Sequence, residues 1–513
     1  MSEIVYTPEQ LAGTEELIGL LFDESKRPRP ANSWDTPLRE ASLAGGAGVG
    51  KTTITREVVA RARELKVPAV FGIAPTWRAA REQRKATGLQ STSCHKFLYT
   101  PPRRGEDTED ESWGMPRKGE KLRFSLQSQS EYLCIPKGSL LLVDEASMIG
   151  EQLARDIRKV AAWRDLRVLW VGDDGQLPPV QEAPGVDLSR ASIVLRQIHR
   201  QAAGNPIISF CSWLREGRSP GSYAFDEAEK ERLWILPRGD SGRVTIGTCV
   251  RAWLKRADHA WDPEVGNVDV AMITFRNLDR RVLNRAVQAE RLKSLSLALP
   301  EEVAALADRA AEADGAEIPP VICVGERVVA TANGGMFNGD LGVVAAIRPI
   351  IRSLHKKPGS ETRGAEDDDE EEAWSGQEKE DLAEEYRHDS YPLCELVVRG
   401  PAGEATLILA GRAVGAGEGT PAYYLPRRWQ QGEARILKEE YDIEIDRAPE
   451  LGYALTCHRA QGSSINRVLV IKHPYSSPRT QDERRRWDYT AASRAALELK
   501  WLTCDELPPS GRG

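Results

Sequence analysis

The octet Gly45-Gly-Ala-Gly-Val-Gly50-Lys51-Thr52 fits the phosphate-binding pattern GxxxxGK followed by Ser or Thr. It follows a short apolar run at 42–44 and opens a helical pattern at 52–65, which is the context that this loop requires. Glycines let backbone N–H groups wrap phosphates, and the N-terminus of the next helix adds a favourable dipole. We expect Lys51 to reach the β- and γ-phosphates and the Thr52 hydroxyl to bind Mg²⁺. The predicted nucleotide-binding residues are Gly45, Gly46, Ala47, Gly48, Val49, Gly50, Lys51, Thr52 and Thr53.

Two adjacent carboxylates, Asp144 and Glu145, end the apolar run at 140–143. Asp144 suits the outer shell of Mg²⁺, and Glu145 suits the base that orients or deprotonates an attacking water. A pair of carboxylates at a strand end is otherwise a common solvated feature, so the interpretation depends on the phosphate-binding loop upstream. Two carboxylates with separate duties indicate hydrolysis, because a kinase would need a pocket for a phosphoryl acceptor.

A glutamine and two arginines complete the candidate catalytic set of Lys51, Glu145, Gln176, Arg200 and Arg494. Gln176 closes the next apolar run, at 167–172, where its amide could donate to the γ-phosphate and accept from water. Arg200 and Arg494 are selected by their sequence context only, since a single arginine is more often part of a surface ion pair.

The elements that must position these residues alternate between short apolar runs and helical patterns, which is typical of a parallel, doubly wound α/β fold. A similar alternation returns with apolar runs at 269–274, 467–472 and 500–503. The stretch at 319–447, which lies between the first two of these runs, is rich in β-type runs and glycine. The sequence therefore predicts two α/β cores, each with an insertion. Core one comprises 1–96 and 138–193 with a small insertion at 97–137; core two comprises 194–318 and 448–513 with a β-rich insertion at 319–447.

The charge of the chain is unevenly distributed. The 13 acidic and two basic residues of 361–385 give that segment a net charge of −11, so the rest of the 513-residue chain carries +4 within the overall −7. A nucleic-acid groove is therefore compatible with the composition, because the position of the charge matters more than its sum. The acidic segment itself is predicted to be a solvated loop.

The remaining composition favours a reduced, cytoplasmic protein. The eight cysteines are scattered, with neither a CxxC pair nor zinc-ligand spacing, and a disulfide framework is not expected. The sequence MSEIVYTPEQ has no basic and apolar segments of a signal peptide, and no apolar run is long enough to span a bilayer. We therefore expect no membrane partner.

Taken together and in order, these blocks resemble those of superfamily-one helicases, in the 5′-to-3′ branch that contains the RecD and phage Dda helicases, and are most similar to the Dda type. Tyr6-Thr-Pro-Glu-Gln10 resembles the Q motif, and the octet resembles motif I. The other blocks are Ala74-Pro75-Thr76 and Ser91-Thr92-Ser-Cys-His95 (Ia and Ib), Asp144-Glu145 (II), Gly172–Gln176 (III), His199-Arg200-Gln201 (IV), Thr274–Asn277, Gly325–Val328, Phe337–Gly342, Thr456–Ser463 (V) and Tyr489–Arg494 (VI).

The resemblance implies two RecA-like P-loop NTPase cores, an SH3-like β-rich insertion in the second, and ATP with Mg²⁺ as cofactors. It implies that Gln10 reads the adenine, that Thr52 and Asp144 hold the metal, and that Arg200 and Arg494 act as arginine fingers. The residues implied for single-stranded DNA are Pro75, Thr76, His95, Asn277, Thr456 and His458. Trp113 in the small insertion could stack on a base, act as a strand-separating wedge or pack in a core, so this insertion is a candidate strand-separating element.

The sequence departs from the family pattern in two places. Motif Ib has one extra residue between Thr92 and His95, and the acidic run at 361–385 is not part of the pattern. The expected function is an ATP-dependent DNA helicase that translocates 5′-to-3′ on single-stranded DNA, takes tailed duplexes, and works in replication, recombination or repair, with replication or single-strand-binding proteins as possible partners. Two alternatives stay open: a strand-stimulated translocase that displaces proteins with little unwinding, and a non-enzymatic single-strand-binding protein with a decayed ATPase.

Overall fold

The computed structural model describes sixteen stretches of the chain, and its compact parts form two units. The described residues are 6–23, 25, 38–100, 126–180, 182–197, 204–224, 229–236, 243–257, 270–294, 321–330, 341–350, 393–400, 403–413, 422–424, 449–476 and 478–508. The first unit comprises Met1–Thr245, Val270–Phe275 and Leu455–Gly513, and the second comprises Ile246–Asp269 and Arg276–Ala454. Arg200, Trp113, the acidic segment 361–385 and residues 337–340 lie outside the described residues.

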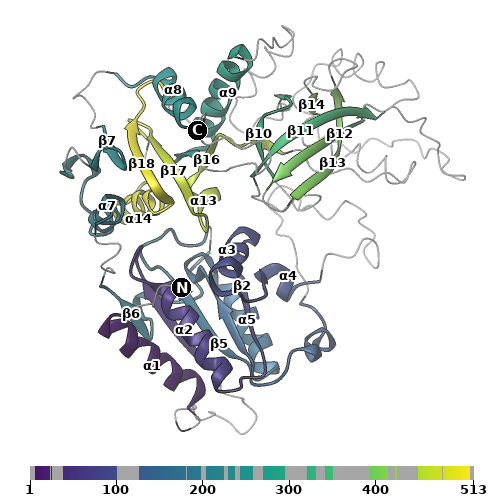
Figure 1. Cartoon of the computed structure of the whole chain (residues 1–513), viewed down its shortest axis with the longest axis vertical. Helices are drawn as coiled ribbons and strands as arrows, with labels where there is room; N and C mark the ends of the chain where they lie inside the picture. The colour runs from purple at the N-terminus through teal and green to yellow at the C-terminus, as the bar shows by residue number, and fades with distance from the viewer. Residues whose placement is uncertain are drawn as a thin grey trace, which may run out of the picture. The chain divides into compact units, whose positions relative to one another are not determined.

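A six-stranded parallel sheet forms the first part of unit one (Figure 1). Its order is β3 (Ser91–Ser93), β2 (Val70–Ala74), β4 (Leu140–Val143), β5 (Arg167–Gly172), β1 (Arg39–Gly45) and β6 (Ile193–Leu195), and each neighbouring pair is parallel. Strands buried on both faces need continuous apolar runs, which 140–143 and 167–172 supply. The carboxyl ends of β1, β4 and β5 therefore meet at one edge.

Helices cover both faces of this sheet. On one face, α1 (Pro8–Phe22) and α2 (Lys51–Glu64) lie side by side, and Leu17 and Val58 pack with Leu142 of β4 (Figure 1). On the other face, α4 (Cys94–Leu98) and α5 (Glu151–Trp163) pack, and Ile157 joins Leu141. Neighbouring residues of β4 thus face opposite layers, as the two-residue period of a strand requires. Helix α3 (Trp77–Thr87) follows β2 and contacts β2, β3 and α2.

Within the predicted small insertion, the described residues on either side of 101–125 lie next to each other. Tyr99 and Leu126 form an antiparallel bridge across the ends of 101–125, and the Gln127 N–H donates to the Leu98 carbonyl at 2.9 Å. The Tyr99 hydroxyl donates to Asp156 Oδ2 of α5 at 2.8 Å. The residues that flank the segment 101–125 are therefore fixed beside α5. Short 3₁₀ turns lie at Gln129–Cys134, Ala146–Met148, Leu188–Arg190 and Pro220–Ser222.

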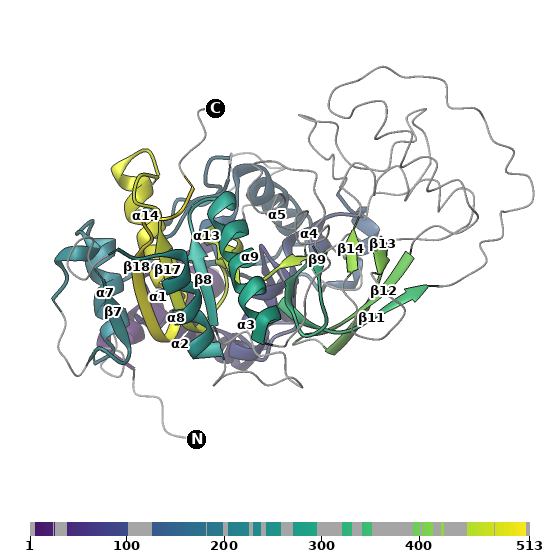
Figure 2. The ribbon, with the colours of Figure 1, turned by 90° about the horizontal axis from the view of Figure 1, so that it is seen from above.

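A second sheet completes unit one. Its order is β16 (Ala454–Thr456), β8 (Val270–Thr274), β17 (Ile465–Lys472), β18 (Ala495–Thr503) and β7 (Leu233–Ile235), and the pairs from β8 to β7 are parallel. Helices α7 (Pro206–Arg215) and α14 (Gln481–Ala492) lie beside β17 and β18, and the short α13 (Cys457–Ala460) follows β16 (Figure 2). Buried rings of Phe210, Trp487 and Trp501 join these helices to β18.

Unit two contains helices α8 (Ile246–Ala257) and α9 (Asn277–Ser294) and a third sheet. This sheet has the order β15 (Glu450–Leu451), β10 (Arg327–Val329), β11 (Leu341–Ile350), β12 (Leu393–Gly400), β13 (Gly403–Ala413), β14 (Ala422–Tyr424) and β9 (Val321–Ile322). All its described pairs are antiparallel, in contrast to the two sheets of unit one.

The predicted fold class is confirmed: two parallel α/β sheets, with a P-loop in the first, and a β-rich insertion. The domain boundaries stay a prediction, and the compact units divide the chain at other positions. Among the described residues, no helix combines the length and the apolar character that a membrane crossing needs. All eight cysteines are free thiols, and only that of Cys134 is exposed.

A buried carboxyl, that of Glu326, joins α9 to the third sheet. Its Oε2 accepts hydrogen bonds at 2.8 Å from Gln288 Nε2 and from the Cys323 N–H. Burial raises the pKa of Glu326 to about 7, although these two donors and the Arg291 and Arg285 guanidinium groups of α9 act in the opposite direction. Cys323 and the buried Tyr453 hydroxyl also face this carboxyl. Ionisation of Glu326 therefore works against the folded state of unit two.

We expect Glu326→Gln to be more stable than wild type at pH 8 and equally stable near pH 4.5. Glutamate ordinarily has a pKa of roughly 4.3, so between about pH 4.5 and 7 the folded state holds a proton that the unfolded state has lost. The free energy of unfolding of the wild type then falls across this range, by a few kcal/mol at most at about 1.4 kcal/mol per pKa unit.

Thermal unfolding of both proteins between pH 4.5 and 8 measures the difference. Glu404→Gln, at an exposed position of β13 in the same sheet, is the matched control and should show no pH-dependent difference from wild type. A constant offset between Glu326→Gln and wild type at all pH values would contradict the assignment.

Candidate active site

The glycine-rich loop connects β1 to α2 at the carboxyl edge of the first sheet. Gly48 has a φ of 76° and Gly50 a φ of 88°, in the left-handed region that favours glycine. A Cβ atom at Gly50 would also overlap the side-chain amide of Gln10. Lys51 Nζ donates to the carbonyl oxygens of Gly45 at 2.7 Å and Gly46 at 2.9 Å. The loop therefore uses glycine at two positions with positive φ, and its role as a phosphate cradle stays a prediction.

Helix α1 supports this loop through Gln10, which is almost completely buried. Its Nε2 donates to the Val49 carbonyl at 3.3 Å, and its Oε1 accepts from the Thr7 N–H at 3.0 Å in a capping box. The amide thus fixes the P-loop to the start of α1. The predicted contact of Gln10 with adenine stays a prediction.

The neighbouring Glu9 has a role that sequence reasoning missed. Its two carboxylate oxygens accept from the backbone N–H groups of Arg196 at 3.1 Å and Gln197 at 3.0 Å, directly after β6. These two residues lead toward Arg200, which lies outside the described residues. A glutamate in the first turn of a helix is common, so the sequence carried no signal for this contact.

The two carboxylates lie directly after β4. Glu145 has a φ of 50°, an uncommon backbone conformation for a residue with a side chain, and its N–H donates to Asp144 Oδ1 at 2.9 Å. Burial, and next the negative charge of Glu145, raise the pKa of Asp144 to about 7, against the influence of the Glu145 N–H and Lys51. Holding this carboxyl ionised needs positive charge nearby.

These residues fit a magnesium ion. Thr52 and Asp144 line the same cavity, and a cation between them would offset the unfavourable ionisation of Asp144. No group of three or more His, Cys, Asp or Glu side chains within the described stretches could hold a metal by itself. Mg²⁺ usually keeps several waters and binds through one or two carboxylates together with substrate phosphates, which is compatible with Thr52 and Asp144 as its protein ligands.

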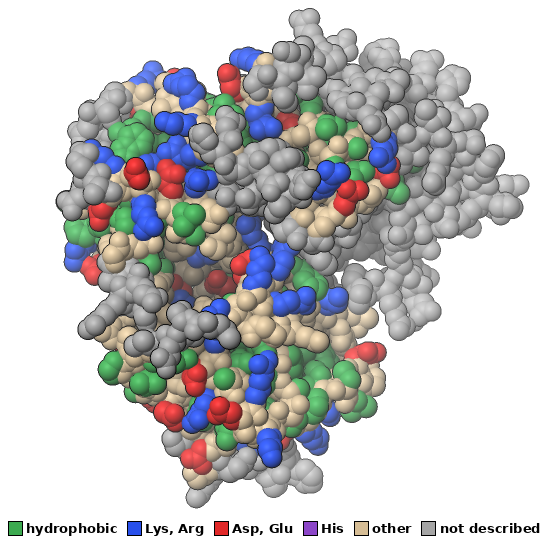
Figure 3. Space-filling view, in the orientation of Figure 1, with side chains coloured by type: hydrophobic (Ala, Val, Ile, Leu, Met, Phe, Trp, Pro, Cys, Tyr) green, Lys and Arg blue, Asp and Glu red, His purple; other side chains and the backbone are tan. Residues whose placement is uncertain are grey.

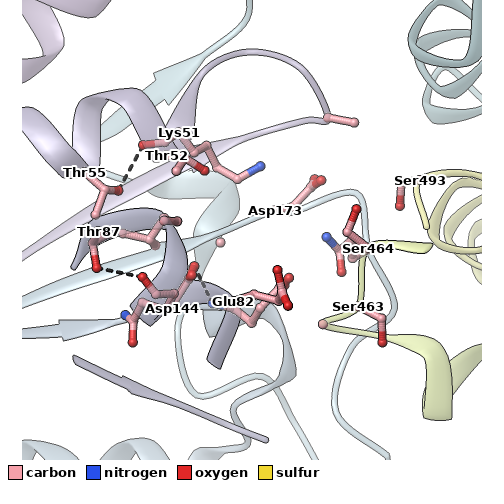
Figure 4. Close-up of a pocket in the computed structure, with 18 of the residues that line it drawn as sticks. Lys51, Thr52, Thr55, Glu82, Thr87, Asp144, Asp173, Ser463, Ser464 and Ser493 are labelled. Atoms are coloured by element: carbon pink, nitrogen blue, oxygen red, sulfur yellow. Dashed lines mark hydrogen bonds between the residues drawn. The ribbon is translucent and has the colours of Figure 1, made fainter. Parts of the chain in front are cut away.

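A cavity of about 340 Å³ joins these groups to the second sheet (Figure 4). Lys51 and Asp144 face it from the first sheet, and Ser463 and Ser464, which precede β17, face it from the second (Figure 4). The lining residues with predicted roles are Ala47, Lys51, Thr52, Asp144, Glu145, Gln176 and Arg494. The structure thus brings together the predicted lysine, carboxylates, glutamine and one of the two arginines.

Arg494 lies at the start of β18 and is 5% exposed. Its guanidinium donates to the Thr490 carbonyl at 3.1 Å, the Ser463 carbonyl at 3.3 Å and Ser493 Oγ at 2.9 Å. Gln176 is also buried, and its Oε1 accepts from Gln461 Nε2 at 3.4 Å. Both side chains are therefore held by neighbours from the second sheet.

The residues predicted for the DNA strand divide between the units. Thr76 caps α3 by accepting from the Ala79 N–H at 3.1 Å, and a Cβ atom at Gly462 would lie 3.6 Å from its Oγ1. The segment that follows Thr456 and His458 therefore comes close to Thr76. His95 and His458 are exposed, Pro75 is half-buried, and all five belong to unit one. Asn277, the exposed first residue of α9, belongs to unit two.

A second cavity, of about 650 Å³, adjoins β3. Trp77 and Lys96 line it, with Lys96 Nζ 5.1 Å from the centre of the Trp77 ring. Figure 3 shows further clusters of Lys and Arg side chains, with acidic side chains between them, on the face it presents. A tryptophan beside a cation at a hollow is chemically suited to a nucleic-acid base and its phosphate.

We expect Gly50→Ala to weaken nucleotide binding at least tenfold and to lower the unfolding temperature. An added Cβ atom is strained at φ 88° and overlaps the Gln10 amide, so that the loop must shift. Gly88→Ala is the matched control, because Gly88 also has a positive φ, of 69°, but has open space around it. It should cost stability, of the order of 1 kcal/mol, and leave nucleotide binding intact. Titration with a fluorescent nucleotide, beside thermal unfolding, separates the two; equal binding by both variants would contradict the role of the loop.

Two family models match parts of the chain. A model described as an AAA domain matches residues 36–233, and one described as a UvrD-like helicase C-terminal domain matches residues 451–500. The first match covers the glycine-rich loop and both carboxylates, and the second covers α13, β17 and Arg494. The two matches thus contain the groups from both sheets that line the cavity.

Individual relatives give a similar picture. The chain is 33% identical to the ATP-dependent RecD2 DNA helicase of Deinococcus radiodurans over 207 residues, which are 40% of this chain and 25% of that protein. It is 23% identical to the ATP-dependent DNA helicase PIF7 of Trypanosoma brucei brucei over 475 residues, covering 84% of this chain and 41% of that protein. The chain thus spans less than half the length of either relative.

Among solved structures, the Pif1 helicase from Candida albicans is 15% identical with a TM-score of 0.41, over 98% of this chain and 95% of that one. The Pif1 helicase from Bacteroides, in complex with ADP-AlF3 and ssDNA, is 16% identical with a TM-score of 0.46, over 99% and 94%. By its sequence matches, the chain is similar to superfamily-one helicases of the RecD and Pif1 type.

Proposed function

We propose that this chain is an ATP-dependent DNA helicase of the Dda-like branch, which moves 5′-to-3′ along single-stranded DNA and unwinds tailed duplexes. The observation that carries the proposal is the cavity in which Lys51, Glu145 and Gln176 from the first sheet meet Arg494 from the second. A site assembled from two sheets can couple events at the nucleotide to a change in their arrangement, as ligand-dependent motions require.

The chemistry of the proposed hydrolysis follows from the placement of each group. Lys51 binds the β- and γ-phosphates, the Glu145 carboxylate orients and deprotonates the attacking water, and Gln176 contacts the γ-phosphate. Arg494 stabilises the negative charge that develops on the transferred group, with Arg200 as the second proposed arginine finger. Mg²⁺, held by Thr52 and Asp144, supplies charge neutralisation when it is bound.

The proposed path of the DNA strand runs over Pro75, Thr76, His95, Thr456 and His458 in unit one, with Asn277 as its proposed contact in unit two. Hydroxyl, imidazole and amide groups suit contacts that track a backbone without reading bases. Trp77 and Lys96, which line the second cavity, directly follow Thr76 and His95 in the sequence. The Trp77 ring offers a surface on which a base could stack.

We expect steady-state ATP hydrolysis to be strongly stimulated by a single-stranded oligonucleotide and to be lost in Glu145→Gln. The substitution removes the base but keeps the size of the side chain, so ATP binding should persist. Hydrolysis with and without the oligonucleotide, beside a fluorescent-nucleotide titration, measures both properties. Retained turnover by Glu145→Gln would refute the role of Glu145, and a rate indifferent to the oligonucleotide would refute a strand-coupled motor.

We expect a duplex with a 5′ single-stranded tail to be unwound and one with a 3′ tail to stay intact. The prediction follows from the proposed 5′-to-3′ movement, since the motor must load on the tail and advance into the duplex. Strand displacement monitored by fluorescence, with a streptavidin block as a parallel substrate, distinguishes the alternatives. Streptavidin removal without unwinding identifies a translocase, and neither activity, together with absent ATP hydrolysis, identifies a single-strand-binding protein.

A further inference from the structure

The hydroxyl of Tyr489 lies between the P-loop and the turn after β5. Tyr489 is buried on α14, and its Oη donates to Asp173 Oδ2 at 2.6 Å. The same oxygen accepts from the Ala47 N–H of the P-loop at 2.8 Å. One side chain from the second sheet thus binds two segments of the first, and burial beside Asp173 holds the pKa of Tyr489 well above its ordinary value.

Two groups of the P-loop that could bind phosphate, the Ala47 N–H and Lys51 Nζ, already have partners inside the protein. The Ala47 N–H donates to Tyr489, and Lys51 Nζ donates to the carbonyls of Gly45 and Gly46. A phosphate in a loop of this kind is bound by backbone N–H groups and by the lysine. A nucleotide that uses the Ala47 N–H must therefore displace the tyrosine hydroxyl.

Tyr489 and Arg215 line a cavity of about 440 Å³ together with Gly46 and Ala47 of the P-loop. The Arg215 guanidinium lies 5.8 Å from the centre of the Tyr489 ring and pairs with Asp174, with its Nη1 3.4 Å from Asp173 Oδ1. A Cβ atom at Gly46 would overlap Arg215 and lie 3.3 Å from Tyr489 Oη. The P-loop approaches Tyr489 this closely because position 46 is a glycine.

Helix α14 also carries contacts that reach the catalytic side chains. Thr490 Oγ1 accepts from the Leu177 N–H at 2.9 Å, and Arg486 Nη1 donates to the carbonyls of Asp174 at 2.6 Å and Gln176 at 3.1 Å. The Arg494 guanidinium binds the Thr490 carbonyl at the end of the same helix. Movement of Tyr489 would therefore be transmitted to the segments that hold Gln176 and Arg494.

We propose that Tyr489 is a positioning residue whose hydroxyl occupies the Ala47 N–H until phosphate displaces it, and so reports phosphate binding to α14. The proposal rests on the proposed function, because it needs a nucleotide in the P-loop. Tyr489 acts through the P-loop and Arg494 and takes no part in ATP hydrolysis itself.

The test is nucleotide binding by Tyr489→Phe in the absence of DNA. The substitution keeps the ring and its packing against Arg215 but frees the Ala47 N–H. We expect the Kd for a fluorescent ATP analogue to fall about threefold to tenfold, the size of one hydrogen bond that no longer has to be displaced. ATP hydrolysis without DNA should rise, and the ratio of DNA-stimulated to unstimulated rates should fall. A merely structural role would weaken binding instead.

Two further variants keep the test decisive. Tyr223→Phe removes the hydroxyl of another tyrosine, one that packs against Phe210 of α7 and makes no contact with the P-loop, and should leave the Kd unchanged. Asp173→Asn replaces the anionic acceptor that polarises the hydroxyl, so the Kd should fall in the same direction as for Tyr489→Phe but by less. It also covers the case in which Tyr489→Phe does not fold, as judged by thermal unfolding.

The outcomes separate this inference from the proposed function. An unchanged or higher Kd in folded Tyr489→Phe overturns the role of Tyr489, while wild-type ATP hydrolysis and its stimulation by DNA continue to support a motor. If wild type itself binds no nucleotide, and so matches Lys51→Ala, the proposed function fails and the inference fails with it.

Discussion

The candidate site depends on the docking of α14 onto the turn at 173–177, because that contact joins the two parallel sheets of unit one. The turn carries Asp173, whose carboxylate is almost completely buried, and buried backbone N–H and C=O groups. All of these groups need hydrogen-bond partners. Asp173 accepts from the Gly175 N–H within the turn, from Tyr489 and, at longer range, from Arg215. Satisfying these groups requires side chains from the second sheet, and the same docking brings Ser463 and Arg494 to the cavity.

The docking is made of several polar contacts, which suits the opening and closing that the proposed function needs. Each neutral hydrogen bond contributes on the order of 1 kcal/mol, because both partners regain water when it breaks. The rings of Phe210, Trp487 and Trp501 contribute the larger apolar stabilisation, and they lie within the second sheet and its helices. The sheets are therefore internally strong and joined by contacts that exchange easily, as expected of parts that move relative to each other.

The sequence predicted what local rules determine and missed what only the assembled fold determines. The runs 140–143 and 167–172 were predicted as strands because several consecutive apolar residues need burial on both faces, whereas the three-residue strands β3, β6 and β7 exist only through their neighbours. Lys51, Asp144 and Glu145 were predicted because their motifs fix both residue type and backbone context. Arg215 was not, because α7 has no motif and its guanidinium reaches Asp173 and Asp174 only after the two sheets meet.

The positive charges that line the cavity suit a polyanionic ligand. Lys51 and Arg494 donate to carbonyl and hydroxyl oxygens, and no ion pair among the described residues joins either of them to a carboxylate. Arg215, in contrast, does not line the cavity, and it pairs with Asp174 and with Asp173, which does. The positive charge of Lys51 and Arg494 is thus held in fixed positions by neutral partners that release it at little cost. Burial, and next the negative charge of Glu145, raise the pKa of Asp144, and a magnesium ion would favour its ionised form. Fixed positive charge at Lys51 and Arg494, together with the buried carboxyl of Asp144, suits the charges of a magnesium–nucleotide complex.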